Sequence, residues 1–284
     1  MATERTAQVD GYLTRYYDMG TGPPIVLIHG GEPGGSAAAD IWVPTNVEQL
    51  ASQFRILAPD RLGQGYTDNP QTPGDYRIGT ICSHLATLIR SSGITDATLV
   101  GQSRGAYIAV HLAREHPDLA RRLVLVNSLS IAPGRAARSK VFEDLVKGDP
   151  TTVRSDAEAM SVTKDHITDA WIEEVRAIRA QPKMLKAREV FSSVAADYYA
   201  DFDKQKGQTL EWVRGGGLTQ PTLVCWGQGD PLTTLEDGFD LYRLFESSGV
   251  PTELHVFSGC GHYPFRERAR AFNVLVTEFA TGHD

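Results

Sequence analysis

The sequence predicts an α/β fold, with a mostly parallel central sheet and helices on both of its faces. Short apolar segments of β composition alternate with longer segments of helical periodicity along most of the chain. The segment 25–28 is apolar at every position, which is typical of a strand that is buried on both faces. Alternation of this kind indicates strands joined by helical crossovers, which is how parallel sheets are built.

The chain opens with an expected antiparallel hairpin. Residues 12–17 have β composition and the dipeptide Asp10-Gly11 before them is a hairpin turn signal, so we expect two strands within 5–17. The alternation begins after this hairpin. The expected strands are 25–28, 54–58, 97–100 and 123–126, and the expected helices are 45–53, 76–92 and 103–115.

The pattern changes between residues 133 and 214, where helical segments follow one another without a convincing strand. The α/β pattern resumes at Pro221, shortly after three glycines at 215–217 that would let the chain turn back. We therefore expect a core formed by 1–132 and 215–284, with 133–214 inserted as a helical cap. The expected cap helices are 135–147, 155–163, 168–180 and 183–202, and the core closes with strands 222–226 and 253–257 and helices 235–247 and 266–280.

Composition limits the classes of function. With 284 residues, of which 41% are hydrophobic, the chain can form one large core and an inserted subdomain. Its net charge of -7 and isoelectric point of about 5.6 argue against nucleic acid or an anionic membrane surface as a general partner. No apolar stretch resembles a signal peptide or a membrane span. We therefore expect a cytoplasmic protein whose partner is a small-molecule substrate.

Cysteine usage gives no sign of a metal site. Cys82, Cys225 and Cys260 lack the paired spacing of metal ligands, and so few cysteines suit a reducing compartment. Cys260 lies close to His262 in the sequence, but a small buried thiol is the simpler interpretation. Neither a metal nor an organic cofactor is predicted.

The segment Gly101-Gln102-Ser103-Arg104-Gly105 carries the strongest chemical signal. It lies between an expected strand and an expected helix, which is the strand–turn–helix setting of a nucleophile elbow. Its glycines permit a sharp turn, so we expect the Ser103 hydroxyl to be exposed as a nucleophile. The backbone N–H of Arg104, at the N-terminal end of the helix, is an expected oxyanion donor. The alternative is a serine that merely caps a core helix.

A glycine-rich loop after strand 25–28 provides the expected second oxyanion donor. The loop contains Gly30, Gly31 and Glu32, and Gly31 is the expected donor by its position. The loop lacks the lysine and hydroxyl end of a phosphate-binding loop, and its glycine spacing differs from that of a dinucleotide-binding turn. We expect structural roles for the preceding His29 and for Asp60, which begins a D-x-x-G-x-G turn.

A serine nucleophile needs a general base at neutral pH. Among the eight histidines, His262 has the most suitable setting, in a glycine-containing loop after the last expected strand. Asp230 follows strand 222–226 and is the expected acid that would orient the imidazole. Glu236 and Asp237 are rivals, but they fall on the following helix, where they are expected to face solvent.

The chain order Ser103, Asp230, His262 is that of α/β-hydrolases, and the whole sequence resembles an α/β-hydrolase with a cap. Several stretches resemble the meta-cleavage product hydrolases. This resemblance implies hydrolysis of a C–C bond in a 2-hydroxy-6-oxo-dienoate from aromatic ring fission, by a homodimer or a larger homo-oligomer. The matching stretches are His29-Gly30-Gly31-x-Pro33-Gly34, Trp226-Gly227-x-x-Asp230, His255-Val256-Phe257-Ser258-x-Cys260-Gly261-His262 and Ile178-x-x-Gln181-Pro182-x-x-Leu185-Lys186.

The chain departs from that family beside the nucleophile. Gln102 replaces the usual asparagine, Arg104 the usual methionine and Ala106 the second glycine after the serine. Glu32 stands where the family often has a third glycine.

The family also places an arginine on a cap helix, where it binds the dienoate carboxylate. Alignment through Gln181-Pro182 puts Glu174 at that position. Arg176 and Arg179 are near it on the same expected helix, so one of them, or Arg104, could bind the carboxylate instead. A solvated helix face is the simpler interpretation of Arg176 and Arg179.

If no arginine takes that role, the substrate is a different acid, an ester or a lactone, cleaved through an acyl-enzyme. A non-catalytic ligand-binding protein of this fold can also keep an intact triad, and the sequence does not exclude it. The expected substrate-binding residues are Gly30, Glu32, Gln102, Arg104, Arg176, Arg179 and Tyr263.

Overall fold

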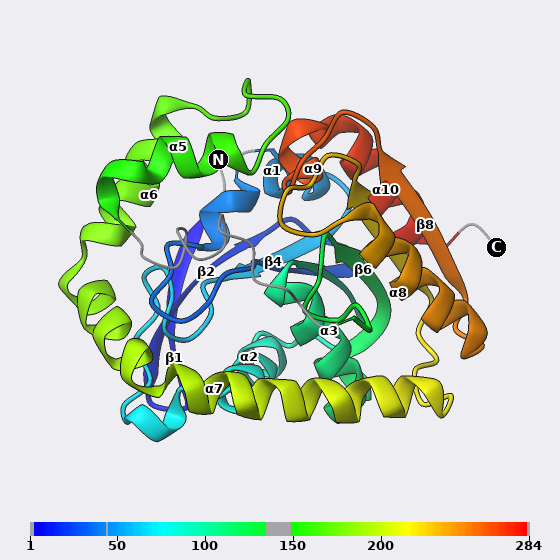
Figure 1. Ribbon diagram of the computed structural model, residues 1–284, viewed down its shortest axis with the longest axis horizontal. Helices are drawn as coiled ribbons and strands as arrows, with labels where there is room; N and C mark the ends of the chain where they lie inside the picture. Colours follow the sequence, from blue (N-terminus) through cyan, green and yellow to red (C-terminus); the bar gives the residue numbers. More distant parts are fainter. Residues whose placement is uncertain (1–2, 44, 135–148, 283–284) are drawn as a thin grey trace.

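The computed structural model describes residues 3–43, 45–134 and 149–282. Within these ranges the strands form one eight-stranded sheet in the order β1-β2-β4-β3-β5-β6-β7-β8 (Figure 1). The strands are β1 (Glu4–Val9), β2 (Tyr12–Met19), β3 (Pro24–Ile28), β4 (Arg55–Pro59), β5 (Ala97–Gln102), β6 (Ala120–Val126), β7 (Thr222–Gly227) and β8 (Thr252–Phe257).

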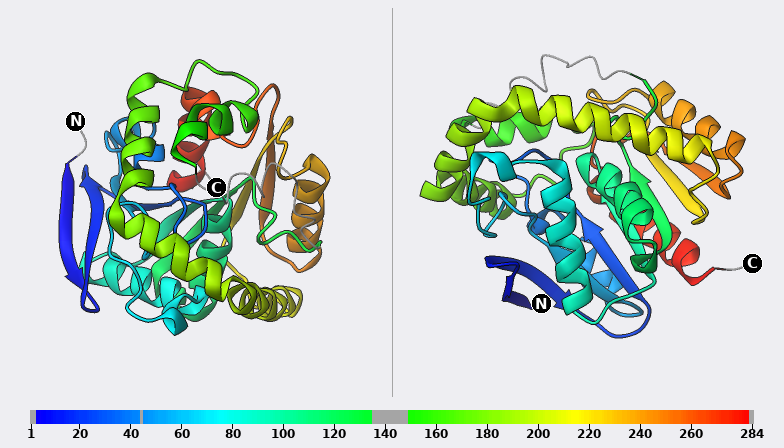
Figure 2. Two further views of the ribbon diagram at one scale, coloured as in Figure 1. Left: turned by 60° about the vertical axis from the view of Figure 1, so that its left-hand side comes forward. Right: turned by 90° about the horizontal axis from the view of Figure 1, so that it is seen from below.

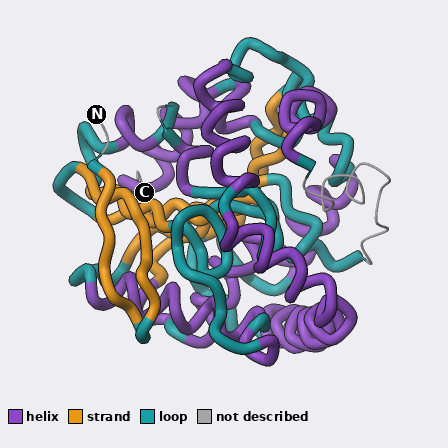
Figure 3. Tube along the Cα trace, turned by 90° about the vertical axis from the view of Figure 1, so that its left-hand side faces the viewer, coloured by secondary structure: helices purple, strands orange, loops and turns teal. Residues whose placement is uncertain are grey.

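The expected hairpin and the expected parallel sheet are both confirmed. Strand β2 pairs antiparallel with β1 and with β4, and every later pairing from β4 to β8 is parallel. The hairpin of β1 and β2 lies at one edge of the molecule, where Figures 2 and 3 show its two strands side by side. Because β3 to β8 run in one direction, the loops after their carboxyl ends gather at one edge of the sheet.

Helices cover both faces of the sheet. On one face, Val26 and Leu99 pack in a buried cluster with residues of α2 (Ile78–Ser91), α3 (Arg104–Glu115) and α8 (Leu235–Ser247). On the other face, Leu27 and Val100 pack with residues of α1 (Val47–Leu50) and α10 (Ala269–Thr281). Neighbouring residues of one strand thus belong to different cores, because successive side chains point to opposite faces. This explains why strand 25–28 is apolar throughout.

Between β6 and β7 the described chain is helical, as the sequence predicts. These helices are α5 (Val153–Ala159), α6 (Asp169–Ala180) and α7 (Pro182–Arg214). Helix α7 runs along one side of the molecule and contacts α2, α3 and α8 (Figures 1 and 2). The expected helix at 135–147 lies outside the described residues.

Several expected helix boundaries were wrong. The expected helix 45–53 is limited to α1, because the chain turns at residues 51–53 before it enters β4. The expected helix 183–202 begins at Pro182 and continues to Arg214, and α7 packs against α2, α3 and α8. The expected helix 266–280 is divided at Arg268, whose φ of -131° is not helical, into α9 (Pro264–Glu267) and α10.

The glycine at 105 allows helix α3 to approach strand β3 closely. A Cβ atom on Gly105 would lie 2.1 Å from the carbonyl oxygen of Ile28, which is far inside van der Waals contact. We expect Gly105→Ala to lower the free energy of unfolding by about 1–3 kcal/mol. Gly207→Ala, at an open position within α7, serves as the control and should raise it by roughly 0.5–1 kcal/mol. Urea titration of both variants measures the difference, and equal effects would contradict the close approach.

Candidate active site

Ser103 lies at the sharp turn between β5 and α3. Its φ of 53° and ψ of -119° are unusual for a residue with a side chain. The turn is held by hydrogen bonds: the Ser103 N–H donates to the Val126 carbonyl at 2.9 Å, and the Ser128 hydroxyl donates to the Ser103 carbonyl at 2.6 Å. A Cβ atom on Gly101 would lie 2.3 Å from the Gly105 carbonyl oxygen, so both glycines are required for this geometry. The arrangement matches a nucleophile elbow.

Asp230 and His262 come together although 31 residues separate them in the chain. Nδ1 of His262 donates to Oδ2 of Asp230 at 2.7 Å, and both side chains are buried. A carboxylate can only accept, so this contact places the neutral imidazole proton on Nδ1 and leaves Nε2 as a proton acceptor. The pair follows β7 and β8, at the same sheet edge as Ser103.

The Asp230 carboxylate is fully surrounded by donors. Burial alone would raise its pKa, but His262 and the hydrogen bonds from Asn127 and Thr233 hold the pKa below its usual value. Oδ1 also accepts the backbone N–H of Leu232 at 2.8 Å. Asn127 and Thr233 are not among the partners predicted from the sequence. Asn127 directly follows β6 with a φ of 46°, so a polar residue just after a strand was the available signal.

The loop that carries His262 is attached to the segment that follows α5. The His262 N–H donates to the Met160 carbonyl at 2.7 Å. The Glu267 carboxylate accepts from the N–H groups of Gly261 at 2.7 Å and Thr163 at 2.8 Å. The position of the imidazole therefore depends on contacts with the helical region between β6 and β7.

The glycine-rich loop lies directly against Ser103. A Cβ atom on Gly30 would lie 2.9 Å from Ser103 Cβ and 2.5 Å from Gln102 Oε1, so this position requires glycine. Gly31 has a φ of 82°, which also favours glycine. Nη2 of the buried Arg61 donates to the carbonyl oxygens of Gly30 at 2.7 Å and Gly31 at 2.6 Å, which orients both peptide groups. This role of Arg61 is not predicted from the sequence.

Arg104 and Glu32 form a buried ion pair beside Ser103. Arg104 Nε donates to Glu32 Oε1 at 3.0 Å, and Nη2 donates to the same oxygen. Tyr198 of α7 donates its hydroxyl to Glu32 Oε2 at 2.8 Å, and the Arg104 guanidinium lies 3.7 Å from the centroid of the Phe202 ring. Burial would lower the pKa of Arg104, but the adjacent Glu32 raises it, so the side chain is charged.

The other expected substrate-binding residues differ in position. Arg176 is exposed at the surface and pairs with Glu173 at 2.6 Å. Arg179 is buried and pairs with Asp156 at 2.9 Å. Arg179 and Tyr263 line a cavity of about 80 Å³ whose walls are mostly apolar residues of α5, α6 and the loop before η1 (Ala39–Trp42). Tyr263, which lines this cavity, directly follows His262 in the chain.

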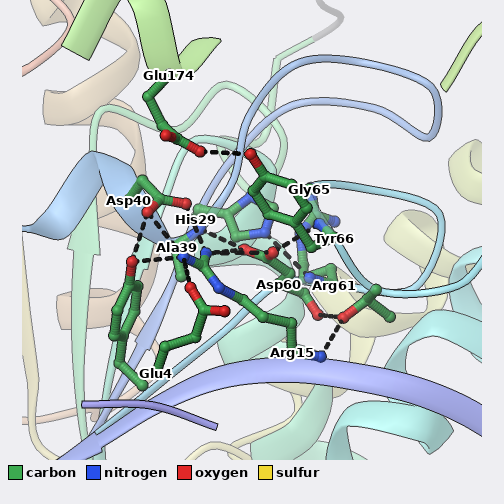
Figure 4. Close-up of polar contacts among 12 residues, drawn as sticks. Glu4, Arg15, His29, Ala39, Asp40, Asp60, Arg61, Gly65, Tyr66 and Glu174 are labelled. Carbon is green, nitrogen blue, oxygen red and sulfur yellow. Dashed lines mark hydrogen bonds and ion pairs between the residues drawn. The ribbon is translucent and has the colours of Figure 1, made fainter. Parts of the chain in front are cut away.

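Beneath the loops at the sheet edge, Asp60 is the centre of a polar cluster (Figure 4). Its carboxylate accepts the N–H groups of Ala39 at 2.7 Å and Tyr66 at 2.8 Å, and it lies 3.3 Å from Arg15. His29 is also buried here; its Nε2 accepts the Arg61 N–H at 3.1 Å, and burial holds the pKa of His29 well below its usual value. These contacts agree with the structural roles expected for Asp60 and His29.

Glu174, the residue aligned above with the arginine of the resembled family, accepts the Tyr66 hydroxyl at 2.7 Å. In the described part of the chain, no three His, Cys, Asp or Glu side chains gather in a way that could hold a metal ion. No helix among those residues is both long and apolar enough to cross a membrane.

A family model of the alpha/beta hydrolase fold matches residues 23–269. The chain belongs to the α/β hydrolase fold family. This α/β hydrolase is 28% identical over 288 residues to a 2-hydroxy-6-oxo-2,4-heptadienoate hydrolase of Pseudomonas putida F1, with 99% of this chain and 97% of that protein covered. It is 30% identical over 288 residues to a 2-hydroxymuconate semialdehyde hydrolase of Pseudomonas sp. strain CF600, with 96% and 92% covered.

Among solved structures, this α/β hydrolase is similar to the meta-cleavage product hydrolase CumD of Pseudomonas fluorescens IP01. The TM-score is 0.80 at 26% identity, and 97% of each chain is covered. The similarity therefore includes the helices between β6 and β7 as well as the sheet. The predicted resemblance to meta-cleavage product hydrolases is confirmed.

The Asp60 cluster predicts a pH dependence of stability for this α/β hydrolase. Burial raises the pKa of Asp60 to about 6, against about 3.9 in an unfolded chain. The folded state therefore binds the proton more tightly, and this contribution is lost as the pH rises from about 4 through 6. Relative to Asp60→Asn, the wild-type protein should lose roughly 2–3 kcal/mol of unfolding free energy across that window.

Urea titrations at several pH values measure this slope. Asp118→Asn is the matched control, because Asp118 is exposed and its pKa is lowered by Arg90. That variant should keep the wild-type slope between about pH 4 and 6. Identical slopes for Asp60→Asn and the wild type would contradict the raised pKa.

Proposed function

We propose that this α/β hydrolase cleaves a C–C bond in a 2-hydroxy-6-oxo-dienoate, a product of ring fission in aromatic catabolism. The observation that carries the proposal is similarity over nearly the whole chain to two hydrolases named for such substrates. Ser103 at a positive φ and the Asp230–His262 pair at the same sheet edge are consistent with this chemistry. No step of the reaction requires a metal or an organic cofactor.

The triad roles follow from the geometry. Asp230 holds the imidazole of His262 in the tautomer that leaves Nε2 free to accept a proton. Ser103, or a water molecule that it activates, is the nucleophile. The N–H groups of Gly31 and Arg104 are the proposed donors to the oxyanion; as the first residue of α3, Arg104 has no acceptor for its N–H within the helix.

Cleavage begins when the dienol substrate ketonises, with His262 moving the proton from oxygen to carbon. The nucleophile then attacks the 6-oxo carbon while His262 takes the proton of the attacking hydroxyl. When the tetrahedral intermediate collapses, the electron pair of the C–C bond passes into the dienolate fragment, which regains a proton from His262. Where Ser103 is the nucleophile, water then hydrolyses the acyl-enzyme to the carboxylic acid; where water is the nucleophile, the collapse itself releases that acid.

We propose that Arg104 contacts the carboxylate of the dienoate. Arg176 is exposed and faces Glu173, and the donors of Arg179 are directed at Ser36, Asp149 and Asp156. Arg104, by contrast, keeps one buried guanidinium nitrogen, Nη1, without a hydrogen-bond partner among the described residues. Gly30, Gln102 and Tyr263 are proposed to line the site around it.

A carboxylesterase or lactonase is the second proposal. The observation that favours it is Glu174, which accepts from Tyr66 at the position where the related family has its carboxylate-binding arginine. The same triad would then form an acyl-enzyme from a small ester.

We also propose that residues 133–214 act as a cap over a core of 1–132 and 215–284. The contacts of Met160 and Thr163 with the His262 loop support a catalytic influence of this segment. Three buried free thiols support a reducing compartment such as the cytoplasm. The family resemblance supports a homodimer or a larger homo-oligomer.

The substrate proposal predicts which compounds the enzyme turns over. Coloured ring-fission dienoates should be bleached with a kcat/KM at least about a hundredfold above that for p-nitrophenyl esters and lactones. Ser103→Ala should abolish both activities. Efficient turnover of esters alone would replace the C–C proposal with the esterase proposal, and no turnover by the wild type would favour a non-catalytic protein.

The carboxylate proposal predicts a selective effect at Arg104. Arg104→Met should raise KM for the dienoate by about ten- to a hundredfold, because a charge-assisted hydrogen bond is lost, and leave KM for p-nitrophenyl acetate within about twofold. Arg243→Met is the control, since Arg243 is exposed and pairs with Asp240 on α8. A rise in KM confined to Arg176→Met or Arg179→Met would overturn the assignment.

A further inference from the structure

Two departures from the related family, Glu32 and Arg104, form a single structural unit. They are 72 residues apart in the chain, yet two nitrogens of the Arg104 side chain donate to one oxygen of Glu32. Each side chain is only 8% exposed. A buried ion pair seldom adds net stability over apolar residues of similar size, so stability alone is a poor explanation for it.

The ion pair connects the two segments that carry the proposed oxyanion donors. One donor is the backbone N–H of Arg104 itself. The other belongs to Gly31, and the peptide that follows Gly31 leads directly to Glu32. The contact between the Arg104 and Glu32 side chains therefore links the segment of one donor to the segment of the other. Because Gly31 and Gly30 are glycines, the loop has no side chain of its own to fix its position against Ser103.

Helix α7 also contacts the Glu32–Arg104 ion pair. Tyr198 donates its hydroxyl to the second oxygen of Glu32, and its own side chain is only 1% exposed. Phe202, one turn further along α7, lies under the Arg104 guanidinium. Glu32 is thus held between the elbow and α7, while Arg61 holds the carbonyl groups of Gly30 and Gly31.

We propose that Glu32 is a positioning residue for the oxyanion hole, which sets the separation of the Gly31 and Arg104 donors and couples it to helix α7 through Tyr198. The proposal rests on the proposed role of Ser103 as the nucleophile. Oxyanion donors act only when they are aimed at the oxygen of the tetrahedral intermediate, so a small shift of one donor slows that step without weakening substrate binding.

Glu32→Gln tests this role directly. The variant keeps a side chain of the same shape but loses the charge that holds Arg104. We expect kcat to fall by about ten- to a hundredfold on both p-nitrophenyl acetate and the dienoate, with KM within about twofold for each, since Arg104 is retained. A change in KM alone, or an unchanged kcat, would overturn the proposal.

Tyr198→Phe tests the connection to α7. It removes one hydroxyl and should lower kcat by about three- to tenfold with KM unchanged. Tyr66→Phe is the matched control, because Tyr66 donates to Glu174 in another contact between the core and the region of α6. Equal effects of the two variants would show a general loss of contacts and would overturn the proposed connection.

A double variant distinguishes two causes of a lower kcat: loss of the positioning of the oxyanion donors, and the cost of leaving a buried charge unpaired. Glu32→Gln combined with Arg104→Met leaves neither charge unpaired, so kcat on the neutral acetate ester should stay low if the pair positions the donors. Recovery to the wild-type kcat would show that the loss came only from the unpaired charge, and would overturn the proposal.

Phenylboronic acid provides a readout that requires no turnover, because it forms a tetrahedral adduct with a serine nucleophile. Glu32→Gln should bind it about tenfold more weakly than the wild type, as measured by calorimetry. If neither the wild type nor the variant binds it better than Ser103→Ala does, the nucleophile proposal itself fails. If Glu32→Gln binds phenylboronic acid as tightly as the wild type does and only Ser103→Ala loses binding, the nucleophile proposal stands and the positioning role of Glu32 fails.

Discussion

The close approach of β3, β5 and α3 is the constraint on which the rest of the site depends. Strand β5 must end in a turn sharp enough to start a helix at the next residue, and the helix backbone must pass within contact distance of Ile28. Gly101 and Gly105 make this possible, because any side chain there would overlap a backbone atom. The turn leaves Ser103 at a φ of 53°, a conformation that the surrounding hydrogen bonds impose rather than one that serine favours.

Around that turn, buried charges are arranged in groups joined by ion pairs and hydrogen bonds. Asp230 accepts five hydrogen bonds, one of them from His262, and Asp60 joins Arg15 to the backbone of two loops. Such groups add little net stability, but each fixes the direction of a loop at this part of the fold. The Arg104–Glu32 pair is a buried charged group of the same kind. It differs in that both partners lie beside the proposed oxyanion donors, so its geometry bears on the reaction itself.

The helices between β6 and β7 are more than a cover for the sheet edge. Met160 and Thr163 contact the His262 loop directly or through Glu267, and Tyr198 contacts Glu32. The proposed base and the proposed oxyanion loop are therefore both attached to this region. Substitutions in the helical region between β6 and β7 can thus change substrate specificity and catalytic geometry together. This is a physical reason for the variety of reactions that the fold supports.

The sequence by itself predicted the sheet, the helices between β6 and β7 and the proposed triad residues. Strand 25–28 is apolar because both of its faces are buried, and the glycines at 101 and 105 mark the turn because no other residue fits there. These are local constraints, so a local pattern records them. The end of α7 was predicted wrongly from the sequence. Packing against α2, α3 and α8 helps to decide where this helix ends, and a local pattern does not record that packing. Only the tertiary structure showed that Glu32 pairs with Arg104, that Asn127 supports Asp230 and that Arg61 holds the glycine loop. Those contacts join residues from different loops, and the distance between loops is set by the packing of the whole sheet, which no short segment encodes.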